Sequence, residues 1–341
     1  MTLHRHASPN APAPRRRTAL ALPIGLGVVL LAVSLRLFSP PELGALLAAP
    51  VQDFFTLSIS VVIESLPFVF LGILLSVLVQ VWLPEGFLLR RLPRNAVARR
   101  IVISLLGVLL PVCECGNVPL ARGLILRGLT VAEAMTFLLA APIVNPVTII
   151  TTYQAFGWDH GILAARIVGG FVVANLIGCI YSRHPDPMST LTPGFQAACA
   201  HAHDADAEPR VRRSVRMFAA ETSAMLPALM VGAGIAGLIQ VVVARDVLVA
   251  IGQNPVLSVF ALMALAFVIA ICSNVDAFFI LSFGATFMPG AIVAFLVFGP
   301  MIDIKMLALM RTTFATRTLV QLTVVVALAS AVLGLAVNAL A

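Results

Sequence analysis

The sequence contains few charged residues. Charged side chains make up 11% of the 341 residues, and hydrophobic residues make up 60%. Soluble domains carry roughly 25% charged residues. The composition therefore excludes an ordinary soluble domain and predicts a multi-pass membrane protein.

The sequence also lacks the motifs of the common enzyme classes. It has no Walker A sequence, metalloprotease motif or nucleophile elbow. Its five cysteines do not form an even, spaced disulfide framework. We therefore predict that the chain is not an enzyme and has no cofactor, so that energy for transport comes from a gradient or another subunit.

The positive charge of the chain is unevenly distributed. The net charge is +7, and the arginines lie in short clusters between apolar segments. That distribution is the one the positive-inside rule predicts, so it indicates a lipid bilayer and not nucleic acid as the partner. We expect a multi-pass protein of the cell inner membrane with a cytoplasmic N-terminus.

The apolar segments divide the chain into six parts. We predict a disordered cytoplasmic tail at 1–17, a first membrane helix and loop at 18–50, a first permease repeat at 51–182, a polar cytoplasmic loop at 183–215, a second permease repeat at 216–315 and a C-terminal membrane helix at 316–341. A signal peptide is the rival interpretation of the first apolar stretch, but that stretch is long for one.

Two parts of the chain resemble each other. Residues 137–145 (FLLAAPIVN) match residues 295–303 (FLVFGPMID) at an offset of 158 residues, and Glu64 to Pro67 is echoed by Glu221 to Pro227. Several residues threaten helix continuity in these regions: Pro67, Gly116, Pro119, Pro142, Pro146, Pro227 and Pro300. Interrupted apolar segments in both halves indicate a secondary-transporter site.

The repeat predicts an all-α polytopic membrane protein whose two related halves form an inverted repeat, with broken or re-entrant helices at the centre. Broken backbone is tolerated within a bilayer only where protein or a water-filled cavity covers it. Segments 101–128 and 255–287 can be hairpins or full crossings. The arginine distribution favours hairpins, because these place the basic clusters on one side of the membrane.

Polar residues near the breaks are the candidate substrate-binding residues. Three are cysteines, whose thiolates suit soft, thiophilic centres, and three are acids, which are costly in a membrane and so indicate function. The candidates are Cys113, Glu114, Cys115, Asn145, Cys272, Asp276 and Asp303.

Each group also has a purely structural interpretation. The thiols can be small buried hydrophobes. The acids can be structural pairs, for instance Asp303 with Lys305 or Glu64 with Arg166. Asn145 and Asp303, which follow matching prolines, can satisfy the carbonyls that those prolines leave free.

The quoted motifs resemble a known family. They are PVCECGNVPL at 111–120, APIVNPVT at 141–148, CSNVDA at 272–277 and FGPMIDIK at 298–305. Over about residues 50–315 the chain is similar to the predicted-permease family that includes the ArsP organoarsenical efflux permeases. Glu114 departs from that pattern, which usually has a small residue such as serine between the cysteines, and an acid there would shift the preference toward a cation.

The resemblance implies an inner-membrane secondary transporter that exports a thiophilic small molecule such as a trivalent organoarsenical, with Cys113, Cys115 and Cys272 as contacts for arsenic. Two alternatives stay open. One is a metal-cation permease or permease-complex subunit with Glu114, Asp276 and Asp303 as oxygen ligands, and the other is a transmembrane thiol-redox carrier. A homo-oligomer and a partner subunit are both compatible with the sequence.

Overall fold

The protein is all-helical over the residues that the computed structural model describes, which are 49–84, 86–110, 112–200, 209–242, 254–284 and 286–340. The predicted tail at 1–17 and the predicted first membrane helix lie outside these ranges. The main helices are α3 (Ala49–Val77), α5 (Ala96–Ser104), α6 (Leu106–Leu109), α7 (Glu114–Leu126), α8 (Val131–Val144), α9 (Pro146–Phe156), α11 (Gly170–Tyr181), α13 (Arg210–Val242), α15 (Leu257–Ile269), α16 (Asp276–Leu281), α17 (Pro289–Met301), α18 (Ile304–Met310) and α19 (Thr316–Leu340).

Shorter elements connect these helices. They are the π-helical turns η1 (Leu78–Trp82) and η3 (Ala165–Gly169), the 3-10 turns η2 (Asp159–Gly161) and η4 (Pro187–Thr190), and the helices α4 (Phe87–Arg91), α10 (Ile162–Ala164) and α12 (Pro193–Ala200). Within the described ranges the only β contact is an isolated bridge between Leu191 and Phe314.

Six helical segments within the described residues are long and apolar enough to cross a membrane. They are Pro50–Trp82, Val131–Phe156, Asp159–Tyr181, Arg210–Val242, Pro289–Met310 and Thr316–Leu340. The sequence had predicted a span at each of these six places. The prediction of an all-α polytopic membrane protein is therefore confirmed.

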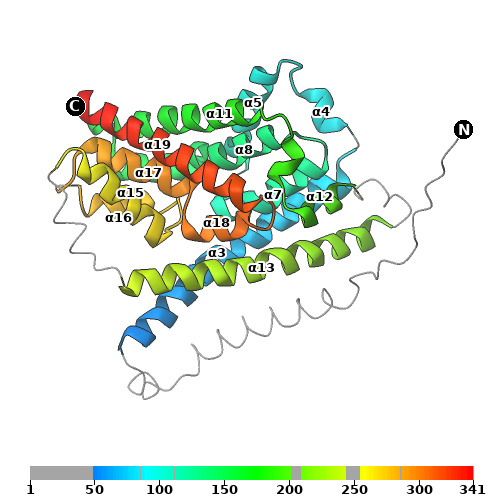
Figure 1. Cartoon of the computed structure of the whole chain (residues 1–341), viewed down its shortest axis with the longest axis horizontal. Helices are drawn as coiled ribbons and strands as arrows, with labels where there is room; N and C mark the ends of the chain where they lie inside the picture. The colour runs from blue at the N-terminus through cyan, green and yellow to red at the C-terminus, as the bar shows by residue number, and fades with distance from the viewer. Residues whose placement is uncertain are drawn as a thin grey trace, which may run out of the picture.

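Two short apolar helices form the interior of the bundle. Every residue of α8 is buried, and all but the first residue of α17 are buried. Both helices are hydrophobic on all sides, which is typical of a helix surrounded by others. Figure 1 shows α3 and α13 along one side of the bundle, with the remaining helices packed together beside them.

Neighbouring outer helices run in opposite directions. The turn η1, which continues α3, lies beside the start of α13, where Trp82 Nε1 donates to Ser214 Oγ at 3.3 Å. The start of α3 lies beside the end of α13, where a Cβ on Gly237 would be 2.2 Å from Ser58 Oγ. The α3–α13 pair is therefore antiparallel, and its close approach depends on the missing side chain of Gly237.

The first interrupted segment folds back on itself. Helix α5 begins beside the start of α8, where Arg99 pairs with Glu133, and α6 passes the end of α8, where a Cβ on Gly107 would be 2.5 Å from Ala141 Cα. The chain leaves the helix after Leu109 and returns along α7 to the turn that starts α8. The segment 101–128 is thus a hairpin.

The second interrupted segment does the same against α17. Asn338 bonds both to Pro255, at the start of α15, and to Gly290, at the start of α17. The end of α15 lies beside the end of α17, where a Cβ on Gly299 would be 3.3 Å from Ala266 Cβ. After residues 270–275 the chain returns through α16, so each half contains a helix, a non-helical apex and a returning helix.

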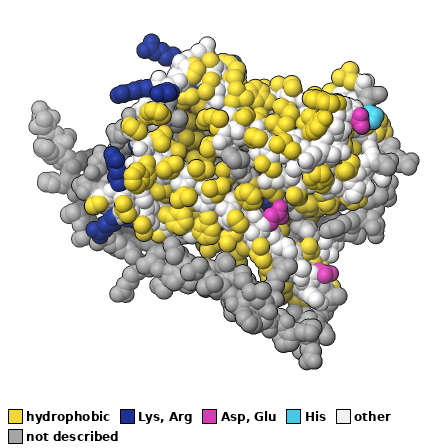
Figure 2. Space-filling view, turned by 180° about the vertical axis from the view of Figure 1, so that it is seen from behind, with side chains coloured by type: hydrophobic (Ala, Val, Ile, Leu, Met, Phe, Trp, Pro, Cys, Tyr) yellow, Lys and Arg dark blue, Asp and Glu magenta, His cyan; other side chains and the backbone are white. Residues whose placement is uncertain are grey.

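The basic clusters lie together at one end of the bundle. Figure 2 shows the Lys and Arg side chains gathered at one side of the molecule, separated from a broad hydrophobic surface. The exposed arginines among the described residues come from both halves: Arg90, Arg91, Arg94, Arg183, Arg210, Arg212, Arg216, Arg311 and Arg317. A hairpin in each half is consistent with this arrangement, since each adds no net crossing of the bundle.

Two details of the sequence-based prediction need correction. Prolines 67, 119 and 227 were expected to break helices, but α3, α7 and α13 continue through them. Pro119 is buried among other helices, whereas Pro67 and Pro227 are exposed on the outer helices. Proline is tolerated in membrane helices, where local adjustment satisfies the freed backbone groups. The polar loop expected at 183–215 contains η4 and α12, and α13 already begins at Arg210.

Candidate functional site

The first half places a carboxylate at the start of a buried helix. Cys113 has an extended backbone and precedes α7, whose first residue is Glu114. Helix N-termini favour negative charge. Helix α7 lies very close to α3, because a Cβ on Gly116 would be 2.4 Å from the Phe68 carbonyl oxygen. Gly116 therefore serves close packing and does not interrupt the helix.

The second half supplies the apex of its hairpin to the same place. Glu114 Oε2 accepts a hydrogen bond from Ser273 Oγ at 3.0 Å and lies 3.4 Å from the Ser273 backbone nitrogen. The Cys272 thiol donates to the same oxygen at 3.6 Å. The apex of one hairpin thus contacts the returning helix of the other.

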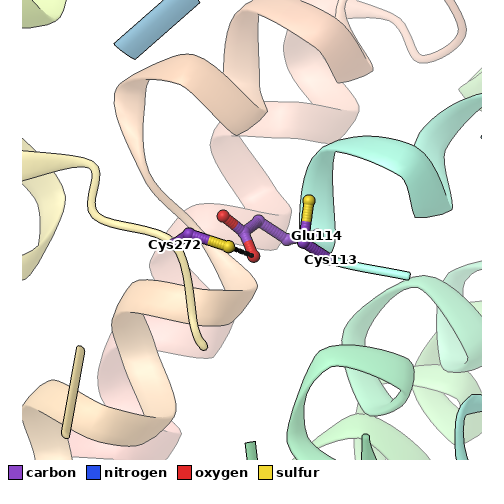
Figure 3. A group of neighbouring side chains, drawn as sticks. All are labelled: Cys113, Glu114 and Cys272. Carbon is purple, nitrogen blue, oxygen red and sulfur yellow. Dashed lines mark hydrogen bonds between the residues drawn. The ribbon is translucent and has the colours of Figure 1, made fainter. Parts of the chain in front are cut away.

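Cys113, Glu114 and Cys272 together form what we term the thiol–carboxylate cluster. Their ligand atoms all lie within 4.8 Å of one another. The three residues are 1%, 0% and 3% exposed, so the cluster is closed to the surface in this conformation. Figure 3 shows the Cys272 sulfur directed at the Glu114 carboxylate, with Cys113 on the other side of Glu114.

A buried lysine completes the surroundings of the carboxylate. Lys305 Nζ lies 3.2 Å from Glu114 Oε1 and 4.0 Å from Asp303 Oδ2, and the residue is 1% exposed. It is the only lysine in the sequence. Sequence reasoning considered it only as a partner of Asp303, two positions away. The contact with Glu114 joins the two halves, and nothing in the sequence pattern indicated it.

Cys115 lies next to the cluster without belonging to it. Its side chain is fully buried, and it lies in the first turn of α7, two residues after Cys113. The sequence raised the idea that three sulfurs converge. Within the described residues, the group close enough to hold one ion contains two sulfurs and one carboxylate.

Asp276 belongs to a separate buried ion pair. Arg166 contacts both of its carboxylate oxygens, at 2.6 and 3.0 Å, and also reaches Thr152 Oγ1 at 2.6 Å. The alternative pairing of Arg166 with Glu64 is therefore corrected. Glu64 has an exposed side chain on α3, and its carboxyl interacts with the backbone of Cys272.

Asn145 and Asp303 occupy equivalent junctions in the two halves. Asn145 separates α8 from α9, accepts a hydrogen bond from Val147 N at 2.9 Å and donates one to the Val112 carbonyl at 3.2 Å. Asp303 precedes α18 and accepts a hydrogen bond from Met306 N. Both residues cap the following helix. The structural interpretation of the sequence was different, because it paired them with the carbonyls that the preceding prolines leave free, whereas Asn145 donates to the Val112 carbonyl.

Asn117 was not selected from the sequence, although it lies one turn beyond Cys113 on α7. Its side chain is 0% exposed, and neither its amide nitrogen nor its amide oxygen has a hydrogen-bond partner among the described residues. Buried polar atoms are rarely left without a partner. Because many asparagines in apolar helices are simply paired, the sequence alone gave no signal that this one would stand out.

These features define a class of protein. A bundle of apolar membrane helices with two facing broken segments and buried polar side chains between them is typical of a membrane transporter. The chain matches the family model described as "Predicted permease" over residues 51–339. The chain belongs to this predicted-permease family, and so is a multi-pass membrane permease rather than an enzyme.

Two relatives cover most of the chain. It is 37% identical to the UPF0718 protein YcgR of Bacillus subtilis over 278 residues, which is 81% of this chain and 94% of that protein. It is 33% identical to a Streptococcus mutans protein named "Putative two-component membrane permease complex subunit" over 270 residues, 77% of this chain and 87% of that protein. No solved structure matches the chain.

Proposed function

We propose that the protein is a secondary transporter that exports a thiophilic small molecule through the thiol–carboxylate cluster, with trivalent organoarsenicals as the substrate class. One observation carries the proposal: two thiols from different halves, Cys113 and Cys272, lie beside each other in the closed centre of the bundle. Thiolates are soft ligands that suit soft centres.

The chemistry of capture requires no redox partner. Methylarsenite carries two As–OH groups. Each As–O bond is exchanged for an As–S bond, and each thiol proton leaves with the displaced hydroxyl as water. Release reverses the exchange by adding two waters. Because the two sulfurs belong to different hairpins, a cargo held by both joins the two halves. Removal of either sulfur leaves the cargo attached to only one half.

The proposed mechanism is alternating access between two inverted repeats. The opposite directions of α3 and α13, and the hairpin in each half, support this arrangement. The basic end of the bundle is assigned to the cytoplasm by the positive-inside rule. In the present conformation the cluster is closed, so cargo can enter only after the hairpins separate.

Resistance and binding test the proposal directly. Cells that carry the protein are expected to tolerate more methylarsenite than cells without it, and Cys113→Ser or Cys272→Ser should remove that tolerance. Cys179→Ser is the matched control, because Cys179 lies on α11 outside the cluster. Full tolerance in both cluster variants, at equal protein levels, would exclude the thiol site.

A soft divalent cation is the second candidate cargo. The observation that favours it is the carboxylate, since Glu114 adds a third ligand to the two thiols. Zn²⁺ and related ions are held by such sulfur and oxygen ligands. Cd²⁺ sensitivity of cells with and without the protein separates the two candidates.

We also propose a partner subunit. The support is the printed name of the Streptococcus mutans relative, which describes a subunit of a two-component permease complex. Purification of the tagged chain from its own cells, followed by mass spectrometry of copurifying membrane proteins, tests this. Recovery of the tagged chain alone, as a monomer or homo-oligomer, would argue against it.

A further inference from the structure

We propose that Lys305 sets the cargo selectivity of the thiol–carboxylate cluster: its ammonium occupies Glu114 and thereby excludes divalent metal cations in favour of a neutral, thiol-reactive cargo. The inference rests on the proposed function, because it concerns the same two thiols. It answers a question that the position of Glu114 raises, namely why an acid between two cysteines does not turn the site into a metal centre.

Hydrogen bonds already occupy both carboxylate oxygens of Glu114. Lys305 occupies Oε1 at 3.2 Å, while Ser273 and the Cys272 thiol occupy Oε2. Both oxygens are therefore engaged before any cargo arrives. A metal ion that takes Glu114 as a ligand competes with all of these partners. A cargo that binds only the two sulfurs removes the Cys272 thiol proton but leaves the Lys305 and Ser273 contacts in place.

The positive charge of Lys305 also opposes a metal ion at Glu114. A metal ion sits about 2 Å from a carboxylate oxygen that ligates it. Since Lys305 Nζ is 3.2 Å from Glu114 Oε1, such an ion would lie within a few ångströms of the ammonium. Two positive charges repel strongly at that separation in a buried site. A neutral arsenic diol meets no such repulsion, because exchanging two As–OH bonds for two As–S bonds leaves its charge unchanged.

The neighbouring charges do not replace Lys305. Asp303 Oδ2 lies 4.0 Å from the ammonium and the residue caps α18, while Asp276 is already paired with Arg166. Glu64 approaches the cluster from α3 through the backbone of Cys272. None of these three acids can supply a positive charge, and Lys305 is the cation in direct contact with Glu114. Removing it leaves two thiols and an unopposed carboxylate.

Selectivity of this kind is often achieved by a repulsive element and not only by attractive contacts. The design is visible in the composition, since the chain uses arginine at all other basic positions and has its one lysine here. An ammonium is a compact point charge, whereas a guanidinium is a wide planar group. Lysine therefore fits between Glu114 and Asp303, where both carboxylates require charge compensation.

The test measures binding of two probes to the purified full-length chain in lipid nanodiscs. Cd²⁺ binding is followed by the ultraviolet absorption of cadmium–thiolate bonds, and methylarsenite binding by protection of the thiols from a maleimide. We expect Lys305→Met to bind Cd²⁺ at least tenfold more tightly than the unmodified chain, with methylarsenite affinity changed less than threefold. The double variant Lys305→Met/Glu114→Gln should lose the gain in Cd²⁺ affinity.

Two further variants keep the test decisive. Lys305→Gln retains a hydrogen-bond donor for Glu114 without the charge, so it replaces Lys305→Met if that variant does not fold, and it should show the same gain. Arg311→Met removes an exposed cation away from the cluster and should leave both affinities unchanged. Equal Cd²⁺ affinity in the unmodified chain, Lys305→Met and Lys305→Gln overturns the role of Lys305.

The outcomes for the two proposals are separable. If the unmodified chain binds no methylarsenite, the proposed function fails, whatever Cd²⁺ does. If methylarsenite binds and Lys305 variants gain no Cd²⁺ affinity, the proposed function stands and the selectivity role fails. Tight Cd²⁺ binding by the unmodified chain contradicts the selectivity role and favours the metal-cation alternative.

Discussion

The two helix junctions that follow the matching prolines occupy equivalent places in the two halves and differ in chemistry. Asn145 joins α8 to α9 and has protein partners for both ends of its amide. Asp303 joins α17 to α18, caps the next helix with one oxygen and leaves Oδ2 without a hydrogen bond beside Lys305. The repeat thus preserves the position of each break, while a charge is present in only one half.

The two hairpins also differ in the residues that they contribute to the thiol–carboxylate cluster. The first contributes Cys113 and Glu114 from the start of α7, and the second contributes Cys272 and Ser273 from the apex before α16. The acid that starts α16, Asp276, faces Arg166 and not the cluster. One half therefore offers its helix-starting acid to the cluster, and the other uses its helix-starting acid to hold the apex in place.

The largest expected effect concerns the pair that holds the second hairpin. Arg166→Met leaves Asp276 charged, buried and unpaired, which typically costs about 3–5 kcal/mol. We expect little folded protein and a large fall in the thermal midpoint of what remains. The double change Arg166→Met/Asp276→Leu should recover much of the loss, because it removes both charges. A single variant as stable as the unmodified chain would show that this pair does not support the apex.

A swap at the first junction should have the next largest effect. Asn145→Asp replaces the amide that donates to the Val112 carbonyl with an acid that cannot donate when ionised. A buried, unsatisfied group of this kind costs about 1–3 kcal/mol, and more when charged. Thermal unfolding in detergent measures the loss. No change would mean that the two junctions are interchangeable.

The matched swap at the second junction should be milder for stability. Asp303→Asn retains a good helix cap, so we expect a change of less than about 1 kcal/mol. It removes a negative charge 4.0 Å from Lys305, and transport of methylarsenite is the property expected to change. Asp303→Ala also removes the cap and should cost about 1 kcal/mol more. Equal stability losses for the two swaps would contradict the contrast between the junctions.

Much of this architecture was predictable because it depends on features that the sequence shows directly. Apolar segment length located the six spans, and the distribution of arginine favoured hairpins over crossings. The offset of 158 residues also relates Glu114 to Cys272, the two positions that meet in the cluster. A repeat alone does not state which equivalent residues face each other, so the contact itself required the structure.

The remaining contacts had no signal in the sequence. Arg166 and Asp276 are 110 residues apart, which does not correspond to the repeat, and their contact depends on how α9 and η3 pack against α16. Lys305 appeared to have an adequate partner in Asp303, so its contact with Glu114 was not considered. The continuous helices at prolines 67, 119 and 227 could not be foreseen either, because a proline in an apolar segment marks a probable and not a certain helix boundary.

The smallest expected effect distinguishes the sulfurs of the first half. Cys115→Ser changes a buried thiol two residues from Cys113 that lies outside the thiol–carboxylate cluster. We expect methylarsenite tolerance to fall by less than about threefold, against complete loss for Cys113→Ser. The two changes place the same hydroxyl in the same helix start, so stability effects of about 1–2 kcal/mol should be similar for both. Protein level and thermal midpoint are measured alongside tolerance to verify this. If Cys115→Ser abolishes tolerance while folding normally, three sulfurs take part, and the cluster must rearrange from its present form when cargo binds.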